Sequence, residues 1–186
     1  MDAPQGSSQA ADPTADLGVA SAASASSLLS ESLANVGKEL GADRVYVFEN
    51  VRGPDGRLWM NLTAEWLRDG MRGLFDAPGT KLHPYSPDFT RWIEVLGDRQ
   101  VLASSVAQLP ESERRVLAAE KTASIVAVPI FLEDGWWGYL GADDCGRGRV
   151  WSPGEIELLR VMAGAVSEDV ERRRRVGRPI VDEALA

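Results

Sequence analysis

The feature that most constrains the fold is an almost unbroken apolar run, Ser124–Leu132, which a turn separates from a second apolar run. A strand that is apolar on both faces is typical of the centre of a sheet, where other elements cover both sides. Asp134-Gly135 is a preferred dipeptide of tight hairpin turns, and Trp136–Ala142 follows it as the expected partner strand. The sequence therefore predicts a central antiparallel hairpin with a layer of other elements on each face.

One amphipathic helix is expected before the strands in the sequence, and another is expected after them. The first runs from about Ser24 to Leu40, because apolar residues recur along it at three- and four-residue steps. The last begins at Ser152, which forms a capping-box pattern with Glu155 and is followed by Pro153 at the first helical position. Its predicted buried stripe is Ile156, Leu159, Met162, Ala163, Val166 and Val170.

The last helix ends in a run of four arginines, Arg172–Arg175. Such a run can contact nucleic acid or an anionic membrane. Here acidic residues stand four positions before three of the arginines, which favours a solvated helix end with internal ion pairs. The expected pairs are Glu168 with Arg172, Asp169 with Arg173, and Glu171 with Arg175.

Short strands and short helices are expected between the two long helices. Val45–Phe48 and Leu58–Trp66 are predicted to form a hairpin around the turn at 52–56. Residues 68–85 contain five Gly or Pro residues and are predicted to form a long ordered loop. Three further elements are expected: a helix from Ser86 to Gly97, a strand at Val101–Ala103, and a helix starting at Pro110-Glu111 that buries Val116 and Leu117.

This order of elements predicts an α/β (α+β) domain with a central antiparallel sheet of about five to six strands. The N- and C-terminal helices should cover one face, and the shorter helices and the long loop should cover the other, with a pocket beneath them. Residues 1–23 have few large apolar side chains and are predicted to be a disordered tail. The domain is expected at 24–174, and 175–186 should be a tail or linker.

Composition excludes several classes of function. The net charge of −8 disfavours binding to nucleic acid. One cysteine, Cys145, and one histidine, His83, are too few for a metal site built from these residues, and the scarcity of cysteine suits a reducing cytoplasm. No apolar run reaches the roughly 18 residues needed to span a bilayer, and the N-terminus lacks a secretory pattern. We therefore expect a cytoplasmic protein without membrane contact.

Five short segments in the second half of the chain form a recognisable pattern. They are Val128-Pro129-Ile130, Trp137-Gly138-Tyr139-Leu140-Gly141, Asp143-Asp144-Cys145, Arg149-Val150-Trp151-Ser152 and Glu155-Ile156-Glu157-Leu158-Leu159. Together with Gln108–Arg114 they resemble the GAF domain family, and the resemblance covers about residues 24–174. It implies a regulatory input domain without catalytic chemistry, of the type found in bacterial sensor kinases and cyclic-di-nucleotide enzymes.

The functional residues of the better-known GAF subfamilies mostly do not transfer. The Asn-Lys pair of cyclic-nucleotide-binding members is absent. Bilin-binding members attach their chromophore through a Cys that is commonly followed by His, whereas Gly146 follows Cys145. Haem-binding members use a His ligand, a role open to His83 only if the loop places it in the pocket. The resemblance therefore leaves the cofactor unknown. Cys145 itself is interpreted as a small buried residue rather than a nucleophile or redox sensor.

Aromatic and loop residues supply the pocket candidates. Aromatic-lined pockets with few polar groups are typical of small-molecule sites, although each aromatic residue is also good core material. Asp143 and Asp144 are adjacent and should point to opposite faces of their strand, so they are not expected to act as a catalytic pair. The candidate ligand-binding residues are Tyr46, Phe48, Trp59, His83, Tyr85, Trp92, Val128 and Ile130.

Three classes of function compete. The first is a sensory domain that binds an unidentified small molecule and passes occupancy through its terminal helices to a kinase or cyclic-di-nucleotide output domain. The second is an interaction module that forms a homodimer through those helices and has no ligand. The third is an enzyme, which is disfavoured because no nucleophile with a base and no phosphate-binding loop is recognisable. About ten residues follow the arginines, so output requires either a longer protein or a separate partner.

Overall fold

The computed structural model describes residues 28–53, 55–76 and 81–177. Within these residues six strands form one antiparallel sheet in the order β3-β2-β1-β6-β5-β4. The predicted fold class and strand number are therefore confirmed. The strands are β1 (Arg44–Arg52), β2 (Leu58–Leu67), β3 (Leu82–Pro84), β4 (Leu102–Ser105), β5 (Ser124–Leu132) and β6 (Gly135–Asp144).

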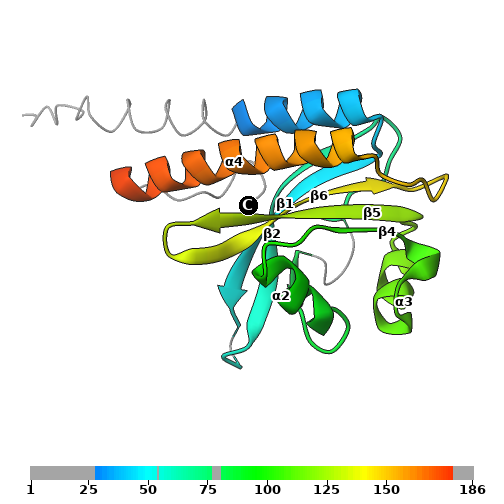
Figure 1. Cartoon of the computed structure of the whole chain (residues 1–186), viewed down its shortest axis with the longest axis horizontal. Coiled ribbons are helices and arrows are strands. Elements are labelled where there is room, and N and C mark those ends of the chain that lie inside the picture. The colour runs from blue at the N-terminus through cyan, green and yellow to red at the C-terminus, as the bar shows by residue number, and fades with distance from the viewer. Residues whose placement is uncertain (1–27, 54, 77–80, 178–186) are drawn as a thin grey trace, which may run out of the picture.

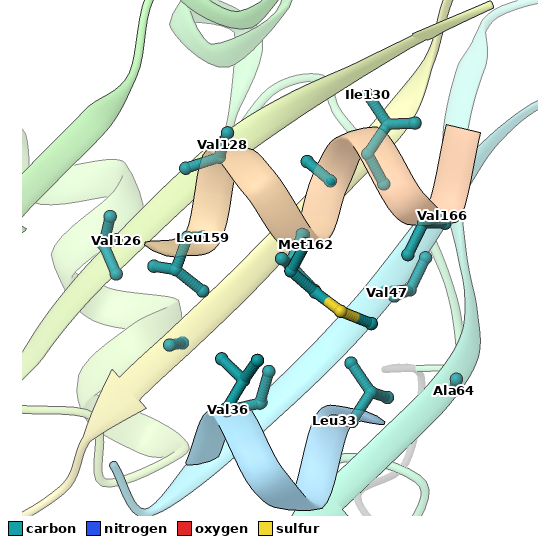
Figure 2. Close-up of a cluster of buried hydrophobic side chains, with 14 of the residues drawn as sticks. Leu33, Val36, Val47, Ala64, Val126, Val128, Ile130, Leu159, Met162 and Val166 are labelled. Carbon is teal, nitrogen blue, oxygen red and sulfur yellow. The ribbon is translucent and has the colours of Figure 1, made fainter. Parts of the chain in front are cut away.

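Two helices lie side by side on one face of the sheet (Figure 1). One is the N-terminal helix, residues 28–40, and the other is α4 (Pro153–Val176). The predicted stripe of α4 is buried at Leu159, Met162, Ala163, Val166 and Val170, which recur at helical spacing. Figure 2 shows this cluster with Leu33 and Val36 of the N-terminal helix beside it.

Strand β5 is buried on both faces, as its apolar run predicts. Val126, Val128 and Ile130 belong to the cluster beneath α4, and the labelled side chains can be followed in Figure 2. Ile125 and Ala127 belong to a second cluster on the opposite face. Successive side chains of a strand point to opposite faces, so one apolar run supplies both cores.

The second face is covered by α2 (Thr90–Gly97), the short helix η1 (Val106–Gln108) and α3 (Glu111–Ala119). Figure 1 shows α2 and α3 on the side of the sheet away from α4. The sequence placed the start of α2 too early: Ser86–Phe89 form turns, and the Phe89 N–H donates to the Tyr85 carbonyl at 2.6 Å.

The predicted long loop contains an edge strand that its pattern did not reveal. In β3, His83 pairs with Met60 of β2. Three residues are too few to show the two-residue alternation of a strand, so only the neighbour β2 determines this pairing. Residues 77–80 of the same segment lie outside the described chain, as do residues 1–27 with the expected N-terminal tail.

The ends of α4 follow their sequence signals. The Ser152 and Glu155 side chains form the reciprocal capping box, and Gly177 ends the helix in the left-handed conformation. Asp169 pairs with Arg173 as predicted, at 2.6 Å. Arg175 instead contacts Glu133 on the β5–β6 turn at 3.5 Å. No helix within the described residues is both long and apolar enough to cross a bilayer.

Candidate functional site

A cavity of about 350 Å³ lies between the sheet and the layer formed by α2, α3 and the 72–74 segment. Its size falls within the range of roughly 300–1,000 Å³ that is usual for small-molecule sites. It lies on the predicted face of the sheet. The lining residues are Arg44, Tyr46, Phe48, Met60, Arg72, Gly73, Leu74, His83, Phe89, Trp92, Val116, Leu117, Ala119, Glu120, Lys121, Ile125 and Tyr139.

One part of the cavity wall is a set of aromatic rings in mutual contact. Phe48 stacks on Tyr139 with ring centroids 5.2 Å apart. Trp92 meets Tyr139 edge-on at 5.6 Å and Phe89 at 5.0 Å, and the His83 ring lies 5.7 Å from Phe89. Offset and edge-to-face contacts of this kind are favourable beyond the area they bury. They fix the shape of an apolar surface that suits a hydrocarbon or planar group.

A buried acid holds Trp92 in place. The Trp92 Nε1–H donates to Glu113 Oε2 at 3.0 Å, and Arg91 binds the same carboxylate through Nε at 2.8 Å and Nη2 at 2.7 Å. The Glu113 side chain is almost completely buried. Of the two residues predicted to be buried on this helix, Leu117 is buried and Val116 is half-buried. A carboxylate can be buried on this helix because three N–H donors satisfy its oxygens.

A second buried network begins at Arg44. The Arg44 Nη2 lies 3.0 Å from Asp143 Oδ2, 2.8 Å from Thr122 Oγ1 and 3.1 Å from the Glu120 carbonyl oxygen. Tyr46 donates its hydroxyl to the other Asp143 oxygen at 2.8 Å. Burial, opposed by Arg44, raises the pKa of Asp143, while burial raises the pKa of Tyr46 well above its ordinary value.

Arg44 has an unused donor next to the cavity. Its side chain is 3% exposed, it lines the pocket, and its buried Nε has no hydrogen-bond partner among the described residues. Burial lowers the pKa of Arg44, but the Asp143 carboxylate and its other neighbours raise it. The net shift is upward, so the guanidinium stays charged. The charged side chain of Arg44 thus forms part of the cavity wall.

The Glu120-Lys121 turn after α3 and the 72–74 segment add charged groups to the wall. Arg72 and Lys121 are exposed lining residues. Glu120 also lines the cavity, and burial followed by the charge of Asp143 raises its pKa to about 7. The 72–74 segment is attached to the sheet through Glu65, whose Oε1 accepts from the Leu74 N–H at 2.7 Å.

Four predicted pocket residues line the cavity: Tyr46, Phe48, His83 and Trp92. His83 brings a buried Nε2 that has no partner within the described part of the chain. Tyr85 belongs to the same core cluster but is wholly buried, and its hydroxyl donates to Asn50 Oδ1 at 2.7 Å instead of facing the cavity.

The remaining predicted pocket residues lie elsewhere. Val128 and Ile130 are wrong as lining residues, because alternation along β5 turns them toward α4 (Figure 2). Trp59 lies near the β1–β2 turn, where its Nε1–H donates to Asp55 Oδ1 at 3.0 Å. It is not among the residues that line the cavity.

Several lining residues were not predicted. Arg44 stands two positions before Tyr46 on the same strand, so the alternation that selected Tyr46 and Phe48 also indicates Arg44. Ile125 follows from the same alternation: its neighbour Val126 faces α4, so Ile125 faces the cavity side of the sheet. The residues contributed by the 72–74 segment and by the turn after α3 carry no such periodic signal, because they lie outside strands and helices.

Cys145 does not resemble a reactive thiol. It is not among the lining residues, and burial, opposed by Arg44, raises its pKa to about 11. Its Sγ lies 3.2 Å from Arg44 Nη2. The described residues contain no group of three or more His, Cys, Asp or Glu side chains placed to hold a metal ion.

Comparison with known proteins gives one family and one curated relative. Residues 24–169 match the model of the GAF domain family. Over 139 residues the chain is 40% identical to the methanogenesis regulatory histidine kinase FilI of Methanothrix harundinacea, a match that covers 75% of this chain. The chain spans only 16% of the length of that kinase.

Solved structures share the fold at low sequence identity. The third GAF domain of Slr1393 from Synechocystis is 20% identical, with a TM-score of 0.65 and coverage of 82% of this chain and 97% of that domain. The PixJ GAF domain of Thermosynechococcus elongatus is 19% identical, with a TM-score of 0.62 and coverage of 83% and 91%. A far-red-absorbing domain, JSC1_58120g3 with bound biliverdin, is 17% identical, with a TM-score of 0.67 and coverage of 81% and 91%.

Proposed function

The chain belongs to the GAF domain family, and on that premise we propose that it is a sensory domain of a cytoplasmic signalling protein. It binds a small molecule between the sheet and the layer of α2 and α3. The observation that carries this proposal is the cavity of about 350 Å³. Its wall combines fixed aromatic rings with the charged side chain of Arg44.

A covalently bound bilin is not supported for this chain, although biliverdin is present in one structure of the same fold. The thiol of Cys145 does not line the cavity, and its pKa of about 11 leaves it protonated near neutral pH. The thiolate is the reactive form of cysteine, so this residue is poorly suited to attach a chromophore. We therefore propose a ligand that is held without a covalent bond.

The output of the sensor is proposed to be of the histidine-kinase class, in agreement with the 40% identity to FilI. Contacts at one end of the sheet link the two terminal helices to each other. Arg149 donates from Nη1 to the Leu40 carbonyl at 2.8 Å, where the N-terminal helix ends, and it pairs with Glu155 in the first turn of α4. A shift at this point changes both helix ends together.

Native mass spectrometry of the purified chain, followed by denaturing release, tests ligand binding. We expect a reproducible extra mass that is lost from Val116→Trp, which fills the cavity. It should be retained in the control Val150→Trp, because Val150 is 91% exposed and does not line the cavity. The released compound should raise the melting temperature of the parent and not of Val116→Trp. An apo spectrum that no cell extract changes would refute the proposal.

A second candidate function is dimerisation through the terminal helices. Leu28 is 62% exposed on the N-terminal helix, and Val161 is 65% exposed on α4. A shallow groove between the two helices is lined by Leu28, Met162 and Ala165, among others. Exposed apolar residues next to a groove favour a self-complementary contact between two copies.

A further inference from the structure

The cavity is polarised along β1. Arg44, Tyr46 and Phe48 alternate on one face of this strand and line the cavity in that order. With a rise of about 3.3 Å per residue, the Cα atoms of Arg44 and Phe48 are roughly 13 Å apart. One end therefore presents a guanidinium, and the other presents aromatic rings.

Neighbouring segments extend the basic end. Lys121 follows Glu120, whose carbonyl oxygen accepts from Arg44 Nη2 at 3.1 Å. Arg72 precedes Gly73, which lies against Leu67, and Leu67 is the β2 partner of Arg44 in the sheet register. Arg72 and Lys121 both line the cavity. Three cationic side chains thus surround the same end.

The aromatic end lies further along the strands. Met60, which also lines the cavity, is paired with Asn50 of β1 and with His83 of β3, beyond the position of Phe48. The rings of Trp92 and Tyr139 complete the wall there, and Tyr139 is 2% exposed. Apolar surface of this kind is stabilised when a hydrocarbon group displaces water from it.

Two cations at the basic end have no ion-pair partner among the described residues. Asp143 pairs with Arg44 from behind the wall, whereas Arg72 and Lys121 line the cavity without a carboxylate within ion-pair distance. Their charges favour an anionic head group. Glu65 and Glu120 also lie near this end, so repulsion makes a singly charged carboxylate a better match than a doubly charged phosphate.

Resting on the proposed function, we propose that the ligand is an elongated apolar monocarboxylate. Its carboxylate lies at the end of the cavity that Arg44, Arg72 and Lys121 line. Its hydrocarbon or aryl body lies between Phe48, Trp92 and Tyr139. The basic end and the apolar far end belong to the same cavity, which favours both parts in one molecule.

Isothermal titration with three probes of equal chain length tests the head group. The probes are decanoate, 1-decanol and decyltrimethylammonium, each used below its micelle concentration. We expect decanoate to bind with one-to-one stoichiometry and about tenfold or more tighter than decanol, because its carboxylate gains charge-assisted hydrogen bonds. The cationic probe should bind more weakly than decanol.

Variants at the exposed cations keep the test independent of folding. Arg72→Gln and Lys121→Gln should each weaken decanoate binding by about three- to tenfold and leave decanol unchanged. Lys38→Gln, an exposed change on the N-terminal helix, is the matched control and should change neither. Arg44→Gln should abolish the preference for decanoate if circular dichroism shows that it folds.

The outcomes separate this inference from the function on which it rests. If decanoate and decanol bind equally and both are lost in Val116→Trp, the carboxylate proposal is overturned and the ligand-binding pocket stands. The same conclusion follows if no probe binds but native mass spectrometry finds a bound species. Binding of no probe together with an apo spectrum would refute both proposals.

Discussion

Glu120 illustrates how a single residue links the pocket to the pH dependence of stability. Its pKa is about 7 in the folded protein, against an ordinary value of 4.5, because it is partly buried and near Asp143. Between these values the folded state holds a proton that the unfolded chain has released. The free energy of unfolding therefore falls as the pH rises from 4.5 to about 7. A shift of this size corresponds to about 3 kcal/mol.

Glu120→Gln should remove this contribution. We expect the variant to be more stable than the parent by about 2–3 kcal/mol at pH 8 and nearly equal to it at pH 4.5, since a neutral amide has no charge to desolvate. Urea unfolding at the two pH values measures the difference. Glu111→Gln, at an exposed position in the first turn of α3, is the control and should show no comparable pH-dependent gain. An equal gain at both pH values would contradict the assignment.

At the scale of elements, the pairing of β1 with β6 depends on glycine. A Cβ at Gly138 would lie 2.0 Å from the carbonyl oxygen of Phe48, and one at Gly141 would lie 2.2 Å from the ring of Tyr46. The missing side chains let β1 approach closely and let the Tyr46 ring lie across β6. The aromatic wall of the pocket thus depends on backbone contacts in the centre of the sheet.

Gly138→Ala should separate the two central strands. The free energy of unfolding should fall by about 2–4 kcal/mol, because the Phe48 carbonyl oxygen belongs to the backbone and cannot rotate away from the added Cβ as a side chain can. Gly164→Ala is the matched change: nothing lies within 4 Å of its added Cβ, and it is in the interior of α4. Alanine there should stabilise by about 0.5–1 kcal/mol. Thermal unfolding of the two variants measures both effects, and similar losses in both would argue against the close approach.

For the whole molecule, the arrangement of two layers on one sheet separates two tasks. The face beneath α4 is a continuous apolar core that fixes the terminal helices, whereas the opposite face keeps a cavity. The sheet is the common wall, so under the proposed function a ligand-induced shift in β1 would reach both helices through the core that they share. This arrangement supports a sensor whose input and output lie on opposite faces.

Dimerisation is tested at the same scale by placing a charge on the exposed helix face. Val161→Glu should shift the protein from dimer to monomer in sedimentation velocity, because an unpaired charge in an apolar contact is costly to bury. Val150→Glu is the control, since Val150 is more exposed and lies before α4 in the connection from β6. A parent protein that is monomeric at every concentration would exclude the dimer.

The sequence by itself determined the elements that have their own periodicity or caps. The double-faced run of β5, the stripe and capping box of α4, and the hairpin of β1 and β2 follow from local side-chain spacing. Spacing also indicated the pocket face of β1 through Tyr46 and Phe48. These properties are local, because residues two to four positions apart already share a face.

Only the tertiary structure decided which segments complete the site. The β3 pairing, the place of Arg72 over the cavity and the burial of Glu113 depend on partners distant in the chain. Val128 and Ile130 were assigned to the pocket because an apolar run alone does not say which alternate residues face which core. That choice is made by register with β6 and by the packing of α4 (Figure 2), since only long-range contacts fix which face of a strand each side chain covers.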